Sequence, residues 1–195
     1  MQYVGHTLFA IFFSLFICGL SAAEGITNYQ TEGNLESTID VGCVELDTLS
    51  NKNTPADLYK GISKCLIEEN YKRAAELFAL AGVYADFDTL RVRDKSAHQA
   101  ITVLQRNAFQ SVKLETKKAL LAHINMTSDR TTNEFHIMCK NIIKLGAPSY
   151  YPRYMIQHGI EAFKPNSTES AINVDFNVSS AWRDSLTNYL HCPES

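Results

Sequence analysis

The sequence predicts an all-α single domain stapled by two disulfide bonds, and three observations lead to that prediction. Apolar residues recur at helical spacing in several segments, and helix-start and helix-stop residues bound those segments. Four cysteines follow a short apolar leader. Removing the 23-residue leader from the 195 residues leaves 172, enough for one domain with a real core. We expect about seven helices built around a buried helical hairpin.

The first 23 residues are predicted to be a cleavable signal peptide. Residues 8–20 form an uncharged apolar run, and the small residues Ser21, Ala22 and Ala23 follow it. A short apolar run before a small-x-small site is typical of secretory signals. The run is shorter than the roughly 20 apolar residues that a spanning helix needs, although an uncleaved anchor remains the alternative. We expect export, with no stable membrane insertion after cleavage.

The four cysteines after the leader are Cys43, Cys65, Cys139 and Cys192. An even number in an oxidising compartment indicates two bridges, for which three pairings exist. We favour Cys43–Cys65 and Cys139–Cys192, because each bond would tie a terminal segment to a nearby helix. A zinc site is the alternative, but the sequence contains no Cys-x-x-Cys pair.

The helical domain is predicted to cover residues 54–195. The polar segment 24–53 precedes it, and a short strand and an irregular tail are both open there. Thr54 supplies a capping hydroxyl before Pro55, which starts the first helix. A second helix over residues 71–84 is small or apolar on nearly every side and should be the central buried one. The pair looks like a tetratricopeptide or Sel1-type hairpin, but no second copy follows, so a solenoid is not expected.

Five further helices are expected towards the C-terminus. Apolar periodicity places them over residues 89 or 94 to 112, 114–124, 131–146, 153–163 and 180–190. Thr131 and Glu134 have the spacing of a capping box at the start of the third of these. Gly146 is expected to end the same helix, because glycine readily adopts the left-handed conformation found after helix ends.

Charge and candidate catalytic groups favour neither nucleic-acid binding nor an enzyme. The formal net charge of −3 gives no electrostatic reason to expect a nucleic-acid partner. Ser149, His158 and Asp175 could be imagined as nucleophile, base and acid, but Ser149 lacks the glycine-flanked elbow of such nucleophiles. No His-Glu-x-x-His motif is present. We therefore predict no catalytic residue, no metal site and no cofactor.

The strongest candidate for a partner-binding surface is a stretch rich in tyrosine. Tyr150, Tyr151, Arg153 and Tyr154 fall within five positions. Tyrosine and arginine are over-represented at binding hot spots, where large side chains lose their water. The alternative is that one or two of these tyrosines pack on the core with their hydroxyls bonded. We expect some tyrosines inside and Arg153 outside.

A second candidate for partner binding follows the buried hairpin. Residues 87–94 contain Asp88, Arg91 and Arg93, and the stretch mixes charges of both signs. These three side chains could contact a partner. The alternative is a solvated turn with local ion pairs, which contribute little to stability.

Several stretches resemble a family of small exported bacterial proteins over residues 54–193. The stretches are residues 57–61, 77–84, 88–92, 97–100, 148–159 and 189–193. The family resembles the periplasmic immunity proteins encoded beside phospholipase D-type effectors of the type VI secretion system. The resemblance implies a periplasmic inhibitor that binds an incoming lipase effector and is not an enzyme. A periplasmic helical adaptor or envelope-binding module with another protein partner is the alternative.

Overall fold

The structure is a computed structural model that describes residues 31–164 and 170–193. The predicted signal peptide lies outside the described residues, as does the start of the polar segment that follows it. Within the described ranges the chain forms seven α-helices and no β-strand. The prediction of an all-α single domain is therefore confirmed.

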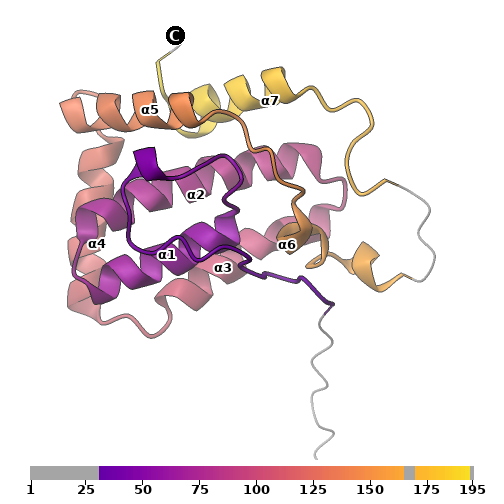
Figure 1. Cartoon of the computed structure of the whole chain (residues 1–195), viewed down its shortest axis with the longest axis horizontal. Helices are drawn as coiled ribbons and strands as arrows, with labels where there is room; N and C mark the ends of the chain where they lie inside the picture. Colours follow the sequence, from indigo (N-terminus) through magenta and orange to yellow (C-terminus); the bar gives the residue numbers. More distant parts are fainter. Residues whose placement is uncertain (1–30, 165–169, 194–195) are drawn as a thin grey trace, which may run out of the picture.

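Two helices, α1 (Pro55–Ile67) and α2 (Tyr71–Arg91), form the central hairpin (Figure 1). α1 begins with a capping box, in which the Thr54 hydroxyl accepts the Asp57 amide and the Asp57 carboxylate accepts the Thr54 amide. α2 is the buried centre, as predicted. Its fully enclosed apolar side chains include Leu77, Leu80, Val83 and Phe87.

The end of α2 differs from the prediction. The apolar pattern predicted an end near residue 84, but α2 continues to Arg91. Its last two turns bury Phe87, whose ring packs edge-on against Trp182 with centroids 6.2 Å apart. They also bury Asp88, which pairs with Arg91 three residues later. Asp88 and Arg91 therefore belong to a packed helix and not to a solvated turn, whereas Arg93 lies beyond the end of α2 and is exposed.

Three helices follow α2 in the expected order, although the first of them is shorter than predicted. A 3-10 turn (Lys95–Gln99) leads into α3 (Ala100–Phe109), and α4 (Leu114–Ser128) and α5 (Asn133–Leu145) come next. Thr132 caps α5 by accepting the Phe135 amide at 3.1 Å. The predicted capping box from Thr131 is therefore wrong by one residue, because the Thr131 hydroxyl donates to Asp129 instead. Gly146 ends α5 with a φ of 82°, as predicted.

The C-terminal third is more broken than the sequence predicts. The expected helix over residues 153–163 consists of a single turn, α6 (Arg153–Ile156), and a separate 3-10 turn (Ile160–Phe163). Gly159 interrupts it with an extended backbone, at φ −77° and ψ 160°. The last helix, α7 (Val178–Asp184), continues as a π-helical turn (Ser185–Tyr189).

Both favoured disulfide bonds, Cys43–Cys65 and Cys139–Cys192, are present. The first fastens residues 31–49, here called the strap, to α1. The strap crosses the hairpin without forming a strand (Figure 1). Asp57 helps to hold it, because its buried carboxylate accepts the amides of Thr38 and Ile39 at 2.7 and 2.8 Å.

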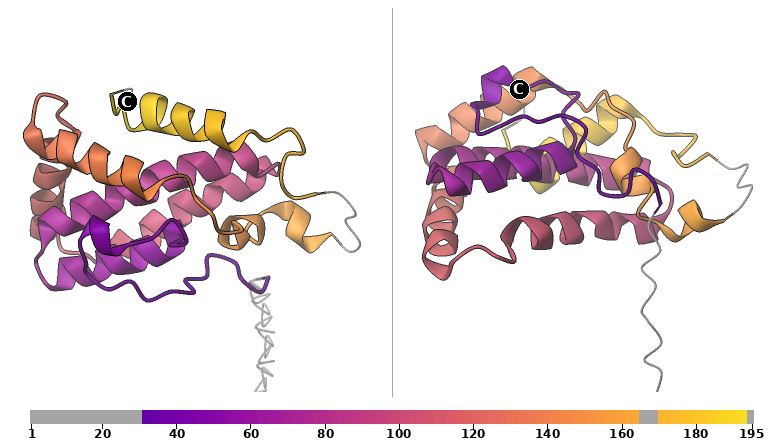
Figure 2. Two further views of the ribbon diagram at one scale, coloured as in Figure 1. Left: turned by 45° about the horizontal axis from the view of Figure 1, so that its top comes forward. Right: turned by 60° about the horizontal axis from the view of Figure 1, so that its bottom comes forward.

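The remaining helices surround the hairpin. In Figure 1, α5 and α7 lie above it, α3 lies below it, and α4 runs across one end between α3 and α5; the views of Figure 2 agree with this arrangement. α6 and the 3-10 turn after it lie at the opposite end from α4. This places the tyrosine-rich stretch beside both the strap and the C-terminal end of α2.

Candidate functional site

Four of the seven predicted partner-binding residues meet inside the protein. Asp88 is fully buried, Tyr154 and Arg91 are nearly so, and Tyr150 is half-buried. Because these side chains face one another across the interior, they are not available to a partner in this conformation. We call this set the Asp88 cluster.

Hydrogen bonds and an ion pair hold the Asp88 cluster together. The hydroxyls of Tyr150 and Tyr154 both donate to Oδ2 of Asp88, at 3.0 and 2.7 Å. Arg91 serves the other oxygen, with Nε donating to Oδ1 at 2.8 Å and Nη2 2.7 Å from the same atom. The guanidinium carbon also lies about 5 Å from the ring centroids of Phe87 and Tyr150. Both carboxylate oxygens are therefore satisfied although Asp88 has no contact with water.

Burial governs the protonation of the Asp88 cluster. It raises the pKa of the Asp88 carboxyl, an effect that Arg91 and the two tyrosine hydroxyls oppose without reversing. Burial, together with the Asp88 charge, raises the pKa values of Tyr150 and Tyr154 well above their ordinary value. Both hydroxyls therefore keep their protons and act as hydrogen-bond donors. The cluster ties the tyrosine-rich stretch to the end of α2.

The two other members of the tyrosine-rich stretch point outwards. Tyr151 is 61% exposed, and the Arg153 side chain is 51% exposed. Between them Pro152 is buried, so inward and outward side chains alternate from Tyr150 to Tyr154. The expectation of some tyrosines inside and Arg153 outside is confirmed. We call Tyr151 and Arg153 the outward pair.

Contacts on both sides fix the backbone that carries the outward pair. Ser149 donates its amide to the Asn51 carbonyl at 2.9 Å, and its hydroxyl donates to the Asn51 side chain at the same distance. Asn51 in turn donates to the carbonyl of Ala147 at 3.0 Å. The Tyr84 hydroxyl donates to the carbonyl of Gly146 at 3.1 Å. The loop is therefore bound to α2 and to the segment before α1, in addition to the Asp88 cluster.

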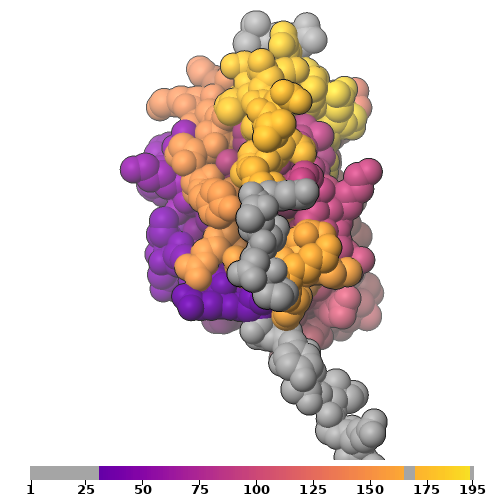
Figure 3. Space-filling model, turned by 90° about the vertical axis from the view of Figure 1, so that its right-hand side faces the viewer, coloured from indigo at the N-terminus to yellow at the C-terminus, as the bar shows by residue number. Residues whose placement is uncertain are grey.

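The strap covers the other side of this loop. Arg153 forms an ion pair with Glu32, with Nη2 2.9 Å from Oε1. The Leu35 amide donates to the carbonyl of Tyr154 at 3.0 Å. Figure 3 shows the same end of the molecule, where the chain around residues 150–163, in orange, meets the strap, in indigo. Arg153 therefore lies at the junction of two segments that are more than a hundred residues apart in sequence.

Sequence reasoning missed Glu32 and Asn51, which complete the surroundings of the outward pair. Neither residue belongs to a recognisable motif. One signal was present, because the strap carries acidic residues and no Lys or Arg. Three of its acids pair with bases on the helical body: Glu32 with Arg153, Asp40 with Lys64, and Glu45 with Arg73.

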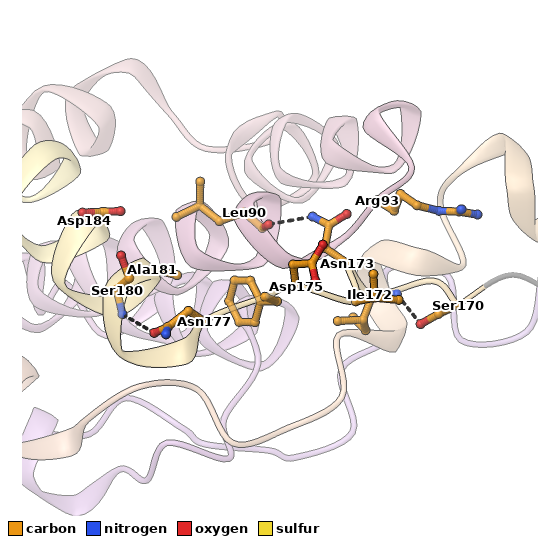
Figure 4. Close-up of a pocket in the computed structure, with 12 residues that line it drawn as sticks. Leu90, Arg93, Ser170, Ile172, Asn173, Asp175, Asn177, Ser180, Ala181 and Asp184 are labelled. Atoms are coloured by element: carbon orange, nitrogen blue, oxygen red, sulfur yellow. Dashed lines mark hydrogen bonds between the residues drawn. The ribbon is translucent and has the colours of Figure 1, made fainter.

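Arg93, the last predicted partner-binding residue, follows the C-terminal end of α2. It is exposed and lines a groove of about 680 Å³ at the C-terminal end of α2 (Figure 4). Leu90, Ile172 and Phe176 form apolar parts of the lining. An isolated bridge to Val92 holds Ile172 beside the end of α2. The two predicted surfaces are thus joined inside the protein through the Asp88 cluster.

Two asparagines that line this groove form hydrogen bonds with nearby backbone groups. The Asn173 side chain donates to the carbonyl of Leu90 at 2.9 Å, and Asn177 accepts the Ser180 amide at 2.9 Å (Figure 4). Asn177 thereby caps α7. These contacts explain the path of residues 170–177, and they do not by themselves indicate a ligand.

The imagined catalytic set is not assembled. Ser149 is bonded to Asn51, and the His158 ring nitrogen Nδ1 lies 2.9 Å from the side-chain oxygen of Asn34. Asp175 lines the groove described above. Burial lowers the pKa of His158. In the described ranges no three His, Cys, Asp or Glu side chains are grouped so as to hold a metal ion.

Comparisons with known proteins leave the geometry as the main evidence. No family model, curated protein or solved structure matches the chain. Among the helices of the described ranges, none is long and apolar enough to span a membrane. The two disulfide bonds fit a protein that is exported to an oxidising compartment.

Proposed function

We propose that this protein is a periplasmic immunity protein, which binds a secreted phospholipase-type effector and neutralises it. The observation that carries the proposal is the outward pair. Tyr151 and Arg153 are exposed on a backbone whose neighbouring side chains are locked inside the protein. The sequence resemblance supplies the class of partner.

A locked backbone suits an inhibitor that acts by binding. Association costs free energy for every side chain and loop that must be ordered, about 0.5–1.5 kcal/mol for each flexible side chain. Here the Asp88 cluster, Asn51 and the strap order the loop before any partner arrives. Tyrosine and arginine are also the residue types that most often dominate binding energy. Less of the favourable contact energy is therefore lost to ordering the loop, and the affinity is higher.

The test of the function begins with the full-length chain expressed in a Gram-negative host. The mature protein would be recovered from the periplasm and titrated by calorimetry into a phospholipase D-type effector encoded beside it. Lipase activity would be followed in the same titration. We expect stoichiometric binding and parallel loss of lipase activity. Absence of binding to that effector would overturn the proposal.

Variants would locate the binding surface. We expect Tyr151→Ala to weaken binding at least about tenfold, as loss of a hot-spot anchor does. Exposed Ile67, the last residue of α1, offers a control, because Ile67→Ala removes a large exposed side chain elsewhere. Equal affinities of the two variants would show that the effector binds through another surface.

A further inference from the structure

The guanidinium of Arg153 is already occupied by a carboxylate from the protein's own strap. Nη2 of Arg153 lies 2.9 Å from Oε1 of Glu32 and 3.4 Å from the Glu32 carbonyl. The Glu32 side chain is 90% exposed. An ion pair with so much contact with water contributes little to stability, typically below about 1 kcal/mol. Glu32 can therefore leave Arg153 at small cost.

The strap nevertheless holds the arginine in place. Gly33 lies against it with a φ of 90°, and a Cβ at Gly33 would come within 2.5 Å of Arg153 Nε. The residues after Gly33 are anchored to α6 and to the residues just after it, because the Leu35 amide bonds to the carbonyl of Tyr154 and the Asn34 side chain bonds to His158. The stem of Arg153 is thus held against the strap, while its charged end remains at the surface, and Tyr151, two residues earlier, is also exposed.

We infer that Glu32 stands in for an acidic side chain of the partner, and that binding replaces Glu32 by this partner carboxylate at Arg153. The inference rests on the proposed function, since it concerns the same surface. A carboxylate brought by a partner would be partly shielded from water once Tyr151 is buried against that partner. A shielded guanidinium–carboxylate pair is stronger than the exposed pair that it replaces. Arginine also suits the exchange, because its planar fork can bind a carboxylate through two parallel hydrogen bonds.

The inference predicts that substitutions of Glu32 and of Arg153 change the affinity for the effector in opposite directions. Glu32→Gln removes the competing charge at nearly constant size, so binding of the effector should strengthen about two- to fivefold. Arg153→Gln removes the group that the partner needs, so binding should weaken about tenfold or more. If the ion pair merely supported the fold, both substitutions would weaken binding.

Two matched controls test other charges of the strap and its ion pairs. Glu36→Gln removes an exposed acid four residues further along, and Arg73→Gln breaks the strap pair with Glu45. Calorimetry would compare all four variants with the wild type at low and at moderate salt. We expect Glu36→Gln and Arg73→Gln to bind as the wild type does. An affinity of Glu32→Gln at or below that of Glu36→Gln would overturn the inference while leaving the proposed function standing.

A second measurement does not need the effector. Poly-L-glutamate would be titrated into the isotope-labelled protein while the Nε–Hε resonance of Arg153 is followed by NMR. We expect a clear shift in Glu32→Gln at poly-L-glutamate concentrations that leave the wild type and Glu36→Gln unchanged. The same response in all three proteins would overturn the inference. Failure of the effector to bind the wild type would instead count against the proposed function alone.

Discussion

The Tyr154 hydroxyl donates a 2.7 Å hydrogen bond to a carboxylate oxygen of Asp88, although the two residues are 66 positions apart in sequence. The same oxygen accepts the Tyr150 hydroxyl, and the other oxygen pairs with Arg91. The last turns of α2 are thereby joined to the loop that carries Tyr151 and Arg153. The buried hydrogen bonds of Asp88 thus connect the core helix α2 to the loop that carries the candidate binding surface.

Removing the charge of Asp88 should destabilise the protein strongly. Asp88→Asn keeps the size of the side chain but leaves the buried Arg91 guanidinium without its counter-ion. Breaking a buried pair from one side typically costs about 3–5 kcal/mol. Urea unfolding would measure the loss, with fluorescence of Trp182, which packs against Tyr84 and Phe87, as the reporter. The exposed acid Asp47 provides the control, since Asp47→Asn should change the free energy of unfolding by less than about 0.5 kcal/mol.

The two tyrosine hydroxyls should show non-additive effects. Tyr150→Phe and Tyr154→Phe each remove one donor from Oδ2 of Asp88 but leave the other, so each should cost about 1–2 kcal/mol. The double variant leaves that oxygen buried with neither tyrosine donor. It should therefore lose more than the sum of the single variants, by about 0.5 kcal/mol or more. A double-mutant cycle by urea unfolding measures this coupling, and strict additivity would mean that the hydroxyls do not share the acceptor.

Local signals predicted the framework of the fold well. Thr54 caps α1 immediately before Pro55, as predicted, and Gly146 ends α5 at a positive φ. Both disulfide bonds join a terminal segment to a helix, as we expected. Each of these features depends on residues close together in sequence or on a bond that only cysteine can form.

The Asp88 cluster could not be predicted in the same way. Asp88 and Arg91 alternate with other charges, a pattern more typical of a solvated turn than of a core. They are buried only because tyrosines from a distant loop supply donors, and no local rule contains that information. The path of the strap could not be predicted either, since its irregular backbone is fixed by Asp57, by ion pairs and by the loop after α5.

Substitutions can test whether Thr132 or its neighbour Thr131 caps α5. Thr132→Ala removes the side-chain acceptor of the Phe135 amide and should cost about 1 kcal/mol. Thr131→Ala is the matched control, because the exposed Thr131 hydroxyl bonds only to Asp129 nearby and its loss should cost less than about 0.5 kcal/mol. Thermal unfolding of the two variants distinguishes the caps. A larger loss in Thr131→Ala would restore the capping box that the sequence indicates.

Asp94 should make the attachment of the turn Ile160–Phe163 depend on pH. Its carboxylate accepts the Ser96 hydroxyl at 2.7 Å, the Ser96 amide at 2.9 Å and the Glu161 amide at 3.0 Å. Partial burial opposes ionisation, but the bonds from Ser96 and Glu161 outweigh it and lower the pKa of Asp94. A lowered pKa in the folded protein means that the carboxylate stabilises the fold above its unfolded pKa of about 4. That stabilisation is lost as the pH falls through the folded value.

The dependence on Asp94 can be measured as a difference between two proteins. The free energy of unfolding of the wild type should exceed that of Asp94→Asn at neutral pH, and the difference should shrink as the pH falls below about 4. Hydrogen exchange at the Glu161 amide should quicken over the same range, because this amide loses its charged acceptor. Asp129→Asn controls for the method, since the pKa of the exposed Asp129 is also lowered, by bonds from Thr131, at a place remote in sequence from the Ile160–Phe163 turn. That variant should leave Glu161 exchange unchanged, whereas a difference between wild type and Asp94→Asn that stays constant with pH would show that the Asp94 charge does not fasten the turn.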